Sequence, residues 1–242
     1  MHACILQKFM EYADKDLYDL RYFSFFKDKG GFSCGMAHRT LVAIYREHSL
    51  YELDGNVWLT TISQTKNAVV KGFLAEQACL GAIKRNGLPA VSSTLDRGMD
   101  WEVFDNTPNW ATLISNRKSK CRLYLPSAIN YANIDAAILS LDQKKKKAHV
   151  YPIQVTLSPY HKDSAKGFYE KQWERWRAVL ETEGYEVSSS FVWIDAEGTP
   201  GQRKVQPLVK HLRSGNKEVL PAYELICINF KEVERRFHNM IF

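Results

Sequence analysis

Two apolar segments between residues 134 and 158 constrain the fold of this chain more than any other stretch. In the first, Asp135 is the one polar residue and no Gly or Pro interrupts the run, a pattern that predicts a strand and not a turn. The second, residues 151–157, alternates with period two, so Gln154 is expected opposite the apolar face. The polar stretch between the segments favours a hairpin tip, which would place Asp135 and Gln154 side by side.

The most regular helical pattern covers Thr65–Arg85 and stops at Asn86-Gly87. Glu76 falls in the middle of its apolar stripe. A carboxylate there loses hydration worth several kcal/mol unless a cation, a metal or hydrogen-bond donors stabilise it. The alternative is a rotated helix in which Glu76 reaches solvent or pairs with Lys71 or Arg85. The apolar members of the stripe are Val69, Phe73, Leu80 and Ile83.

The remaining patterns predict a mixed sheet with one further helix. Apolar residues make up 45% of the chain, which is ample for such a core. The helix is expected over Ser164–Glu183, begun by Asp163 or Ser164 and ended by Gly184, with Phe168, Trp176, Val179 and Leu180 on its apolar side. Strands or strand fragments are expected at residues 91–94, 101–104, 110–114, 121–125, 191–194 and 223–228. The order of elements indicates an α/β fold with a single mixed sheet.

Residues 1–62 are expected to form a small helical module ahead of the α/β domain, which would span 63–242. Helical spacing recurs before Gly30-Gly31 and again over His38–His48, and a turn at Asp54-Gly55-Asn56 leads into a short strand. Two helices followed by a short hairpin are compatible with a winged-helix arrangement.

The cysteines and the apolar runs bear on the compartment. Five cysteines are scattered in no metal-binding pattern, which is typical of reduced thiols in an intracellular protein. The first residues soon become charged, so no signal peptide is expected. The longest apolar runs, such as Leu225–Ile228, are too short to cross a membrane.

The charge of the chain indicates a polyanionic partner. The formal net charge is +6, and the basic residues gather in clusters away from the apolar segments. Each cluster taken alone is also compatible with a solvated loop tip. The clusters are Arg117–Arg122, the tip Lys144, Lys145, Lys146 and Lys147, and the group Arg203, Lys204, Lys210, Arg213 and Lys217.

Glu76, Asp135 and Gln154 together would form an oxygen-rich site. Carboxylate and amide oxygens are the ligands that Mg²⁺ or Mn²⁺ takes in proteins. Such an ion neutralises phosphate charge and lowers the pKa of a bound water, which is the chemistry of phosphodiester cleavage. Gln154 is a neutral ligand, so the affinity for the ion is expected to be modest.

These motifs resemble the restriction-endonuclease-like, or PD-(D/E)XK, superfamily, and most closely the nuclease-type domains of Crinkler and retrotransposon-hot-spot proteins. The likeness spans about residues 66–230. It implies an αβββαβ core, a bound Mg²⁺ or Mn²⁺, cleavage of double-stranded DNA, and action in a nucleus, the host nucleus for a secreted effector. The residues that carry it are Gly72–Glu76, Tyr124–Pro126, Asn133–Asp135, Gln154–Thr156 and His161.

One position departs from the superfamily pattern. Thr156 stands where the motif has its catalytic lysine, and a hydroxyl cannot supply the positive charge that stabilises the transition state. The resemblance leaves Lys166 or Lys171, on the following helix, as alternative sources of an ammonium. His161 is a candidate general base or phosphate contact, and equally an ordinary loop histidine.

Three functions remain open on the sequence alone. The first is a metal-dependent deoxyribonuclease with little sequence preference, because no base-reading motif is visible. In it Lys144–Lys147, Arg203 and Lys204 would hold DNA phosphates. The second is a non-catalytic, DNA-binding Crinkler-type effector on a degenerate nuclease fold, and the third is a protein-interaction module. A dimer and a fragment of a longer effector are both compatible with these functions.

Overall fold

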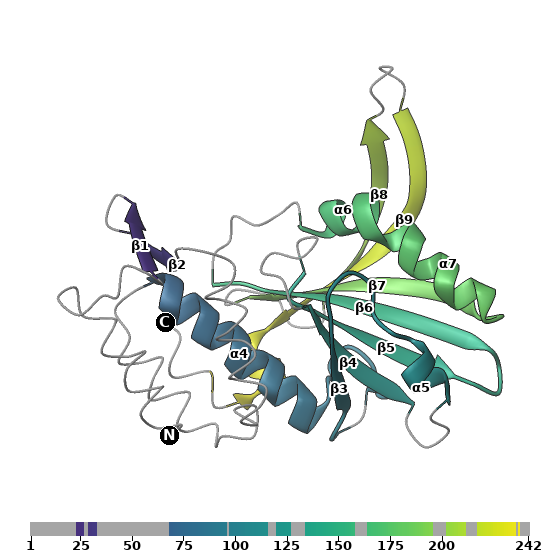
Figure 1. Cartoon of the computed structure of the whole chain (residues 1–242), viewed down its shortest axis with the longest axis horizontal. Helices are drawn as coiled ribbons and strands as arrows, with labels where there is room; N and C mark the ends of the chain where they lie inside the picture. The colour runs from purple at the N-terminus through teal and green to yellow at the C-terminus, as the bar shows by residue number, and fades with distance from the viewer. Residues whose placement is uncertain are drawn as a thin grey trace.

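A computed structural model describes the chain over residues 23–26, 29–32, 68–95, 97–115, 120–126, 134–157, 164–195, 202–211, 217–235 and 237. The fold is α/β with a mixed seven-stranded sheet, in the strand order β3-β4-β5-β6-β7-β9-β8 (Figure 1). The strands are β3 (Asp100–Phe104), β4 (Cys121–Pro126), β5 (Ala136–Asp142), β6 (Lys147–Val155), β7 (Glu186–Asp195), β8 (Gln202–His211) and β9 (Lys217–Asn229). The α/β class and the mixed sheet expected from the sequence are confirmed.

The helices of the described region are α4 (Ala68–Asn86), α5 (Ala111–Ser115), α6 (Ser164–Phe168), α7 (Glu174–Thr182) and α8 (Phe230–Val233). A π-helical segment, η4 (Tyr169–Trp173), joins α6 to α7. A separate two-stranded hairpin pairs β1 (Phe23–Phe26) with β2 (Lys29–Phe32).

The centre of the sheet is an antiparallel meander followed by a crossover. β4 pairs with β5 and β5 with β6, both antiparallel. The helical segment α6–η4–α7 then returns the chain so that β7 runs parallel to β6. β9 continues in parallel beside β7, β8 pairs antiparallel with β9 at one edge, and β3 pairs parallel with β4 at the other.

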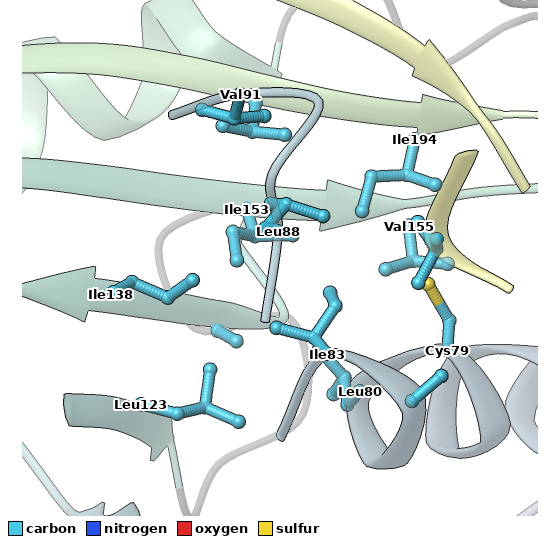
Figure 2. Close-up of a cluster of buried hydrophobic side chains, with 14 of the residues drawn as sticks. Cys79, Leu80, Ile83, Leu88, Val91, Leu123, Ile138, Ile153, Val155 and Ile194 are labelled. Carbon is cyan, nitrogen blue, oxygen red and sulfur yellow. The ribbon is translucent and has the colours of Figure 1, made fainter. Parts of the chain in front are cut away.

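Strand alternation sends side chains into a core on each face of the sheet. On one face Ile138 and Ile153 meet the α4 residues Cys79, Leu80 and Ile83, as Figure 2 shows. The opposite face carries an aromatic core, where α6, η4 and α7 pack on the sheet. α4 and α7 therefore cover opposite faces (Figure 1). The fully buried aromatic side chains of the second core are Trp110, Tyr124, Phe168, Trp176 and Phe191.

The end of α4 agrees with the prediction. Gly87 adopts a left-handed φ of 72°, and its N–H donates to the Ile83 carbonyl at 2.8 Å. This conformation is readily adopted by glycine, and it terminates the helix one residue after the predicted end.

The second long helical segment, α6–η4–α7, also has the predicted extent. The prediction was wrong for one residue that it placed on the apolar side. Gly184, with φ of 80°, ends the segment. Trp176 and Leu180 are fully buried, whereas Val179 is 42% exposed. The π-helical turn at Tyr169–Trp173 changes the phase of the helix, and α7 meets the sheet through positions four residues apart.

Two predicted strands are wrong. Residues 91–94 form turns, in which the Val91 N–H donates to the Leu88 carbonyl at 3.0 Å. Residues 111–115 form helix α5, because the Asn109 side chain accepts a hydrogen bond from the Ala111 N–H at 3.2 Å and caps the helix. Apolar content misled the prediction at both places, since a short apolar run suits a buried turn or helix as well as a strand.

Strand β8 was not predicted. It lies at the edge of the seven-stranded sheet, and β9 is its one partner among the described strands. Arg203, Lys204 and Val205 are all exposed, so the segment lacks the alternating apolar pattern of a half-buried strand. β8 and β9 extend beyond the other strands as a two-stranded arm (Figure 1).

Most of the predicted N-terminal module lies outside the described residues. Within it the structure describes only the β1–β2 hairpin, in which Gly30 and Gly31 pair with Phe25 and Ser24 instead of ending a helix. The two predicted helices, the strand after Asp54-Gly55-Asn56 and the winged-helix arrangement stay predictions.

Within the described ranges, no helix is both long enough and apolar enough to cross a membrane.

The buried side of α7 can be tested with neighbouring residues. Leu180→Ala should lower the free energy of unfolding by about 2–5 kcal/mol, because it leaves a cavity in the aromatic core. Val179→Ala, one residue away on the exposed side, should change it by less than about 0.5 kcal/mol. Urea denaturation of both variants measures the difference; equal losses would contradict the observed helix phase.

Candidate functional site

Asp135 lies immediately before β5 and not inside a strand, which corrects the sequence prediction. Its backbone still continues the pairing, since its N–H donates to the Ile153 carbonyl at 2.8 Å. The residue therefore stands at the open end of the β5–β6 ladder, where strand geometry no longer dictates the direction of its side chain.

The Asp135 carboxylate closes that open end. The last β5–β6 pair joins Ala136 to Ile153, so Val155 lies beyond the backbone ladder. Oδ2 of Asp135 accepts the Val155 N–H at 2.7 Å and Nε2 of Gln154 at 2.6 Å. Both bonds involve a charged acceptor and belong to the stronger class of hydrogen bonds. No hydrogen bond within the described part of the chain reaches the second oxygen, Oδ1.

Gln154 is brought beside Asp135 as the sequence predicted. Its Nε2 donates to Asp135 and also lies 3.3 Å from the Val155 carbonyl. Because the carboxylate and the carbonyl only accept, the nitrogen of the amide and not its oxygen faces them. Gln154 therefore serves here as a donor, and its Oε1 makes none of the hydrogen bonds found among the described residues.

Glu76 approaches from α4, one turn before the fully buried Cys79 and Leu80. Glu76 is partly exposed and not completely buried. It still lies on the helix stripe that packs into the core, as the sequence predicts. Oε1 accepts a hydrogen bond from Gln77 at 2.9 Å. Burial, and next the negative charge of Asp135, raise the pKa of Glu76 well above its usual range, while the Gln77 bond opposes the shift.

The two carboxyl groups lie close enough to repel each other. Burial raises the pKa of Asp135 to about 7, although the hydrogen bonds from Val155 and Gln154 lower it. The pKa of the Cys79 thiol is raised as well, first by burial and then by the negative charges of Asp135 and Glu76. The Cys79 sulfur points toward Val155 in Figure 2, the residue whose N–H binds Asp135. The fold therefore brings two acids, far apart in sequence, into one partly buried place.

No described cation balances this pair. The groups that shift the pKa of Glu76 and of Asp135 include no lysine or arginine of the described residues. Lys166 on α6 and Lys171 on η4 are both exposed, and neither forms an ion pair with the two acids within the described ranges. The two helix-borne lysines expected as substitutes for the motif lysine do not reach the acids in this structure.

Thr156 is buried, with 7% of its surface exposed. Its N–H donates to the Ile194 carbonyl at 2.9 Å, which extends the β6–β7 ladder past the last residue of β6. The backbone thus places Thr156 one step beyond Val155, on the same side of the strand as Gln154. His161, the candidate base or phosphate contact, lies outside the described residues.

The lysine tip belongs to the same sheet as the acids but to its opposite end. Lys147 pairs with Asp142 next to the tip, and seven residues of β6 separate it from Gln154. At a strand rise of about 3.3 Å this is about 23 Å. A phosphate held at the tip is therefore more than one nucleotide away from the acids.

Several of the basic side chains expected to hold DNA contact the protein itself. Lys145 lies 3.9 Å from Asp142, and Lys147 lies 3.3 Å from Glu186. Lys146 donates to the Glu183 carbonyl at 3.2 Å and lies over the Tyr185 ring. Such exposed pairs are weak, so they leave the charge available. Lys144 and Lys204 are exposed, and Arg203 pairs with Glu224 at 3.1 Å.

Three or more His, Cys, Asp or Glu side chains placed to hold one metal ion do not occur among the described residues. The pair of acids with one amide is thus the nearest approach to the predicted metal site there.

Two residues of the site were not predicted. Cys79 follows Glu76 by one helical turn, a spacing that could have identified it. The Val155 N–H leaves no sequence signal, because any residue except proline would supply it.

Neither a protein-family model nor a curated protein nor a solved structure matches this chain.

The raised pKa of Asp135 predicts how stability depends on pH. Well below pH 4 the carboxyl is protonated in both the folded and the unfolded state, so it does not affect the free energy of unfolding. As the pH rises toward 7 the unfolded state ionises first, so the metal-free folded state loses up to about 1.4 kcal/mol per pH unit for this group. Above about pH 8 the loss should be constant.

The comparison with Asp135→Asn isolates this effect, because asparagine does not titrate. The unfolding free energy of the parent minus that of the variant, measured by urea denaturation in chelator, should fall between pH 4 and 7. A difference that stays level over this range would mean that the carboxyl is hydrated. The subtraction also removes His149, whose pKa, lowered to about 4, has the opposite effect on stability.

Proposed function

We propose that this protein is a metal-dependent nuclease that cleaves DNA phosphodiester bonds with little sequence preference. The observation that carries the proposal is the convergence of Glu76 and Asp135, two acids from α4 and from the start of β5, with Gln154 hydrogen-bonded to one of them.

The order of elements supports a restriction-endonuclease-like core. α4 is followed by β3 and α5, and then by the meander β4-β5-β6, the helical segment α6–η4–α7, and β7, which runs parallel to β6. With β3 and α5 as additions between α4 and β4, this order is compatible with the αβββαβ arrangement that the resemblance implies. In such a core the acids come from the first helix and the second strand; here Glu76 lies on α4 and Asp135 immediately before β5.

The residues present suit a hard divalent cation. The two carboxylates repel each other, and burial raises the pKa of each. Mg²⁺ or Mn²⁺ would relieve both effects and takes oxygen ligands. Oδ1 of Asp135 accepts no hydrogen bond from the described residues, and a half-turn of the Gln154 amide would present Oε1. The donor set therefore fits the ion, with Glu76, Asp135 and Gln154 as ligands.

When bound, the ion would supply charge neutralisation at the phosphate and acidify an attacking water. The protein contributes the positions. The Val155 N–H fixes Oδ2 of Asp135 at 2.7 Å, so the other oxygen of that carboxylate is held in a defined direction. Glu76 accepts a hydrogen bond from Gln77, and because its pKa is raised, metal binding would release a proton from it.

DNA would be held away from the acids. The net charge of +6 favours a polyanion, and Lys144–Lys147 with Lys204 are exposed. Their contacts with phosphate would be independent of base sequence. The resemblance to restriction-endonuclease-like domains of Crinkler proteins also implies action in a nucleus.

A second function is favoured by one observation. Thr156 replaces the motif lysine, and no described cation acts on Asp135. Without a positive charge to orient the water and stabilise the transition state, the site loses a main source of rate acceleration. The alternative is a non-catalytic, DNA-binding Crinkler-type effector that keeps the nuclease fold.

Cleavage of supercoiled plasmid separates the two functions. With Mg²⁺ or Mn²⁺ the parent protein should nick the plasmid. Asp135→Asn and Glu76→Gln should each lower the rate about 100-fold or more, because each removes a ligand of the ion.

The matched control is Glu181→Gln, the same change on the exposed side of α7, which should cut like the parent. Variants of Asp135 and Glu76 that cut as well as the parent would refute the nuclease. A parent that binds plasmid without cutting it would support the non-catalytic alternative.

Binding of duplex DNA tests the basic tip. Replacing Lys144, Lys145, Lys146 and Lys147 by Gln should flatten the dependence of log K on log salt. The change should be up to about 0.9 for each lysine that contacts a phosphate. Lys231→Gln, at an exposed position of α8, serves as the control, and fluorescence anisotropy at several salt concentrations is the measurement. No detectable binding at low salt would favour a protein-interaction module instead.

A further inference from the structure

A chain of hydrogen bonds crosses three neighbouring strands on the face of the sheet that carries α4. Nδ1 of His149 on β6 lies 2.7 Å from the Ser188 hydroxyl, and its Nε2 lies 2.9 Å from the Ser190 hydroxyl. Ser190 on β7 in turn donates to Glu224 on β9 at 2.6 Å. None of these residues was singled out by the sequence patterns, and none belongs to the Asp135 site.

Counting hydrogens gives this chain a direction. Burial raises the pKa of Glu224, but the bonds from Ser190 and Arg203 outweigh it and lower the pKa overall. Glu224 is therefore ionised and only accepts. Ser190 has one hydroxyl hydrogen and gives it to Glu224, so its oxygen must accept from His149. Nε2 of His149 consequently carries the hydrogen, and Nδ1 has a free lone pair.

The Ser188 hydroxyl is then the donor to His149. It has one hydrogen and two acceptors within reach, Nδ1 of His149 at 2.7 Å and the Ala148 carbonyl at 3.4 Å. The shorter contact is the stronger hydrogen bond, so the hydrogen lies toward Nδ1. A proton can leave Ser188 for His149, while Ser190 and Glu224 hold the far side of the ring.

The ring itself is held in place. His149 packs against Tyr151 with centroids 4.2 Å apart, and Glu224 is anchored by Arg203 at 3.1 Å. Ser190 is 2% exposed, whereas Ser188, at the other end of the chain, is exposed. The middle of the chain is thus shielded, Glu224 is partly exposed, and the Ser188 hydroxyl is open to solvent, as a relay that activates a surface hydroxyl requires.

The strength of the base limits the substrate. Burial lowers the pKa of His149 to about 4, although the charge of Glu224 opposes the shift. The ring is therefore neutral and ready to accept a proton near pH 7, but it is a weak base. Only substrates with good leaving groups suit such a base.

We propose that Ser188 is a nucleophile, with His149 as its general base and Ser190 and Glu224 as positioning residues, and that it reacts with activated acyl esters. Oγ of Ser188 bonds to the acyl carbon as its proton moves to Nδ1 of His149. The bond to the leaving group breaks, and the departing oxygen takes that proton. Water then hydrolyses the acyl-serine by the same route, and Glu224 stabilises the transient imidazolium through Ser190.

A fluorophosphonate probe tests the nucleophile. Its phosphorus should bond to Oγ of Ser188 as fluoride leaves, and mass spectrometry of the digested protein should locate the adduct on that residue. Ser188→Ala should abolish this adduct. His149→Gln should slow it about tenfold or more, and Glu224→Gln should slow it to a smaller extent, because each removes part of the relay. Release of nitrophenolate from p-nitrophenyl acetate should follow the same order.

Ser115→Ala is the matched control, an exposed serine whose hydroxyl binds only the Thr112 carbonyl among the described residues; it should leave labelling unchanged. An unlabelled Ser188 in the parent would overturn the proposal, as would equal labelling in a folded His149→Gln. If His149→Gln does not fold, unchanged labelling in folded Glu224→Gln would overturn it instead.

Discussion

The hydrogen bond from the Val155 N–H to the Asp135 carboxylate organises the candidate site. The bond lies just before the start of β5, where the Val155 N–H of β6 has no β5 carbonyl opposite it and needs another acceptor. A backbone donor left unpaired in this partly buried place would cost about 1–3 kcal/mol, so the carboxylate has a structural role whether or not it binds a metal. That role keeps one oxygen fixed and leaves the other for chemistry. It also places the negative charge of Asp135 near α4, where that charge raises the pKa of Glu76 and of Cys79.

The two cores explain why the acids meet at one end of the sheet. α4 packs on one face through Cys79, Leu80 and Ile83, and its N-terminal half passes the end of β6 with Glu76 on the same stripe. The aromatic core on the other face holds α6, η4 and α7, and so fixes β7 parallel to β6. The His149 chain and the basic tip lie along β6 at increasing distance from the acids. The lysine tip, the proposed metal ligands and the proposed nucleophile Ser188 therefore lie in different regions of one sheet.

The sequence patterns predicted the central elements well and the edges poorly. The meander with its polar tip, the long helix ending at Asn86 and the helix ending at Gly184 all have strong periodicity or glycine stops, and all are present. β8 was missed because an exposed edge strand has no buried face to impose alternation. Residues 91–94 and 110–114 were assigned wrongly because short apolar runs do not distinguish strands from buried turns and helices. The His149 chain was invisible because its bonds join residues on different strands, at separations no local pattern records.

The sequence by itself determined which residues can be acids, amides and donors, where α4 must stop, and that Gln154 faces away from the apolar side of β6. These follow from residue chemistry and from the fixed periods of helix and strand. Only the tertiary structure decided that Asp135 leaves the strand to accept from Val155, that Glu76 lies near it without a described cation, and that the lysine tip points away. Register, strand ends and packing between distant segments set those distances, because they depend on contacts that form only when the whole sheet is assembled.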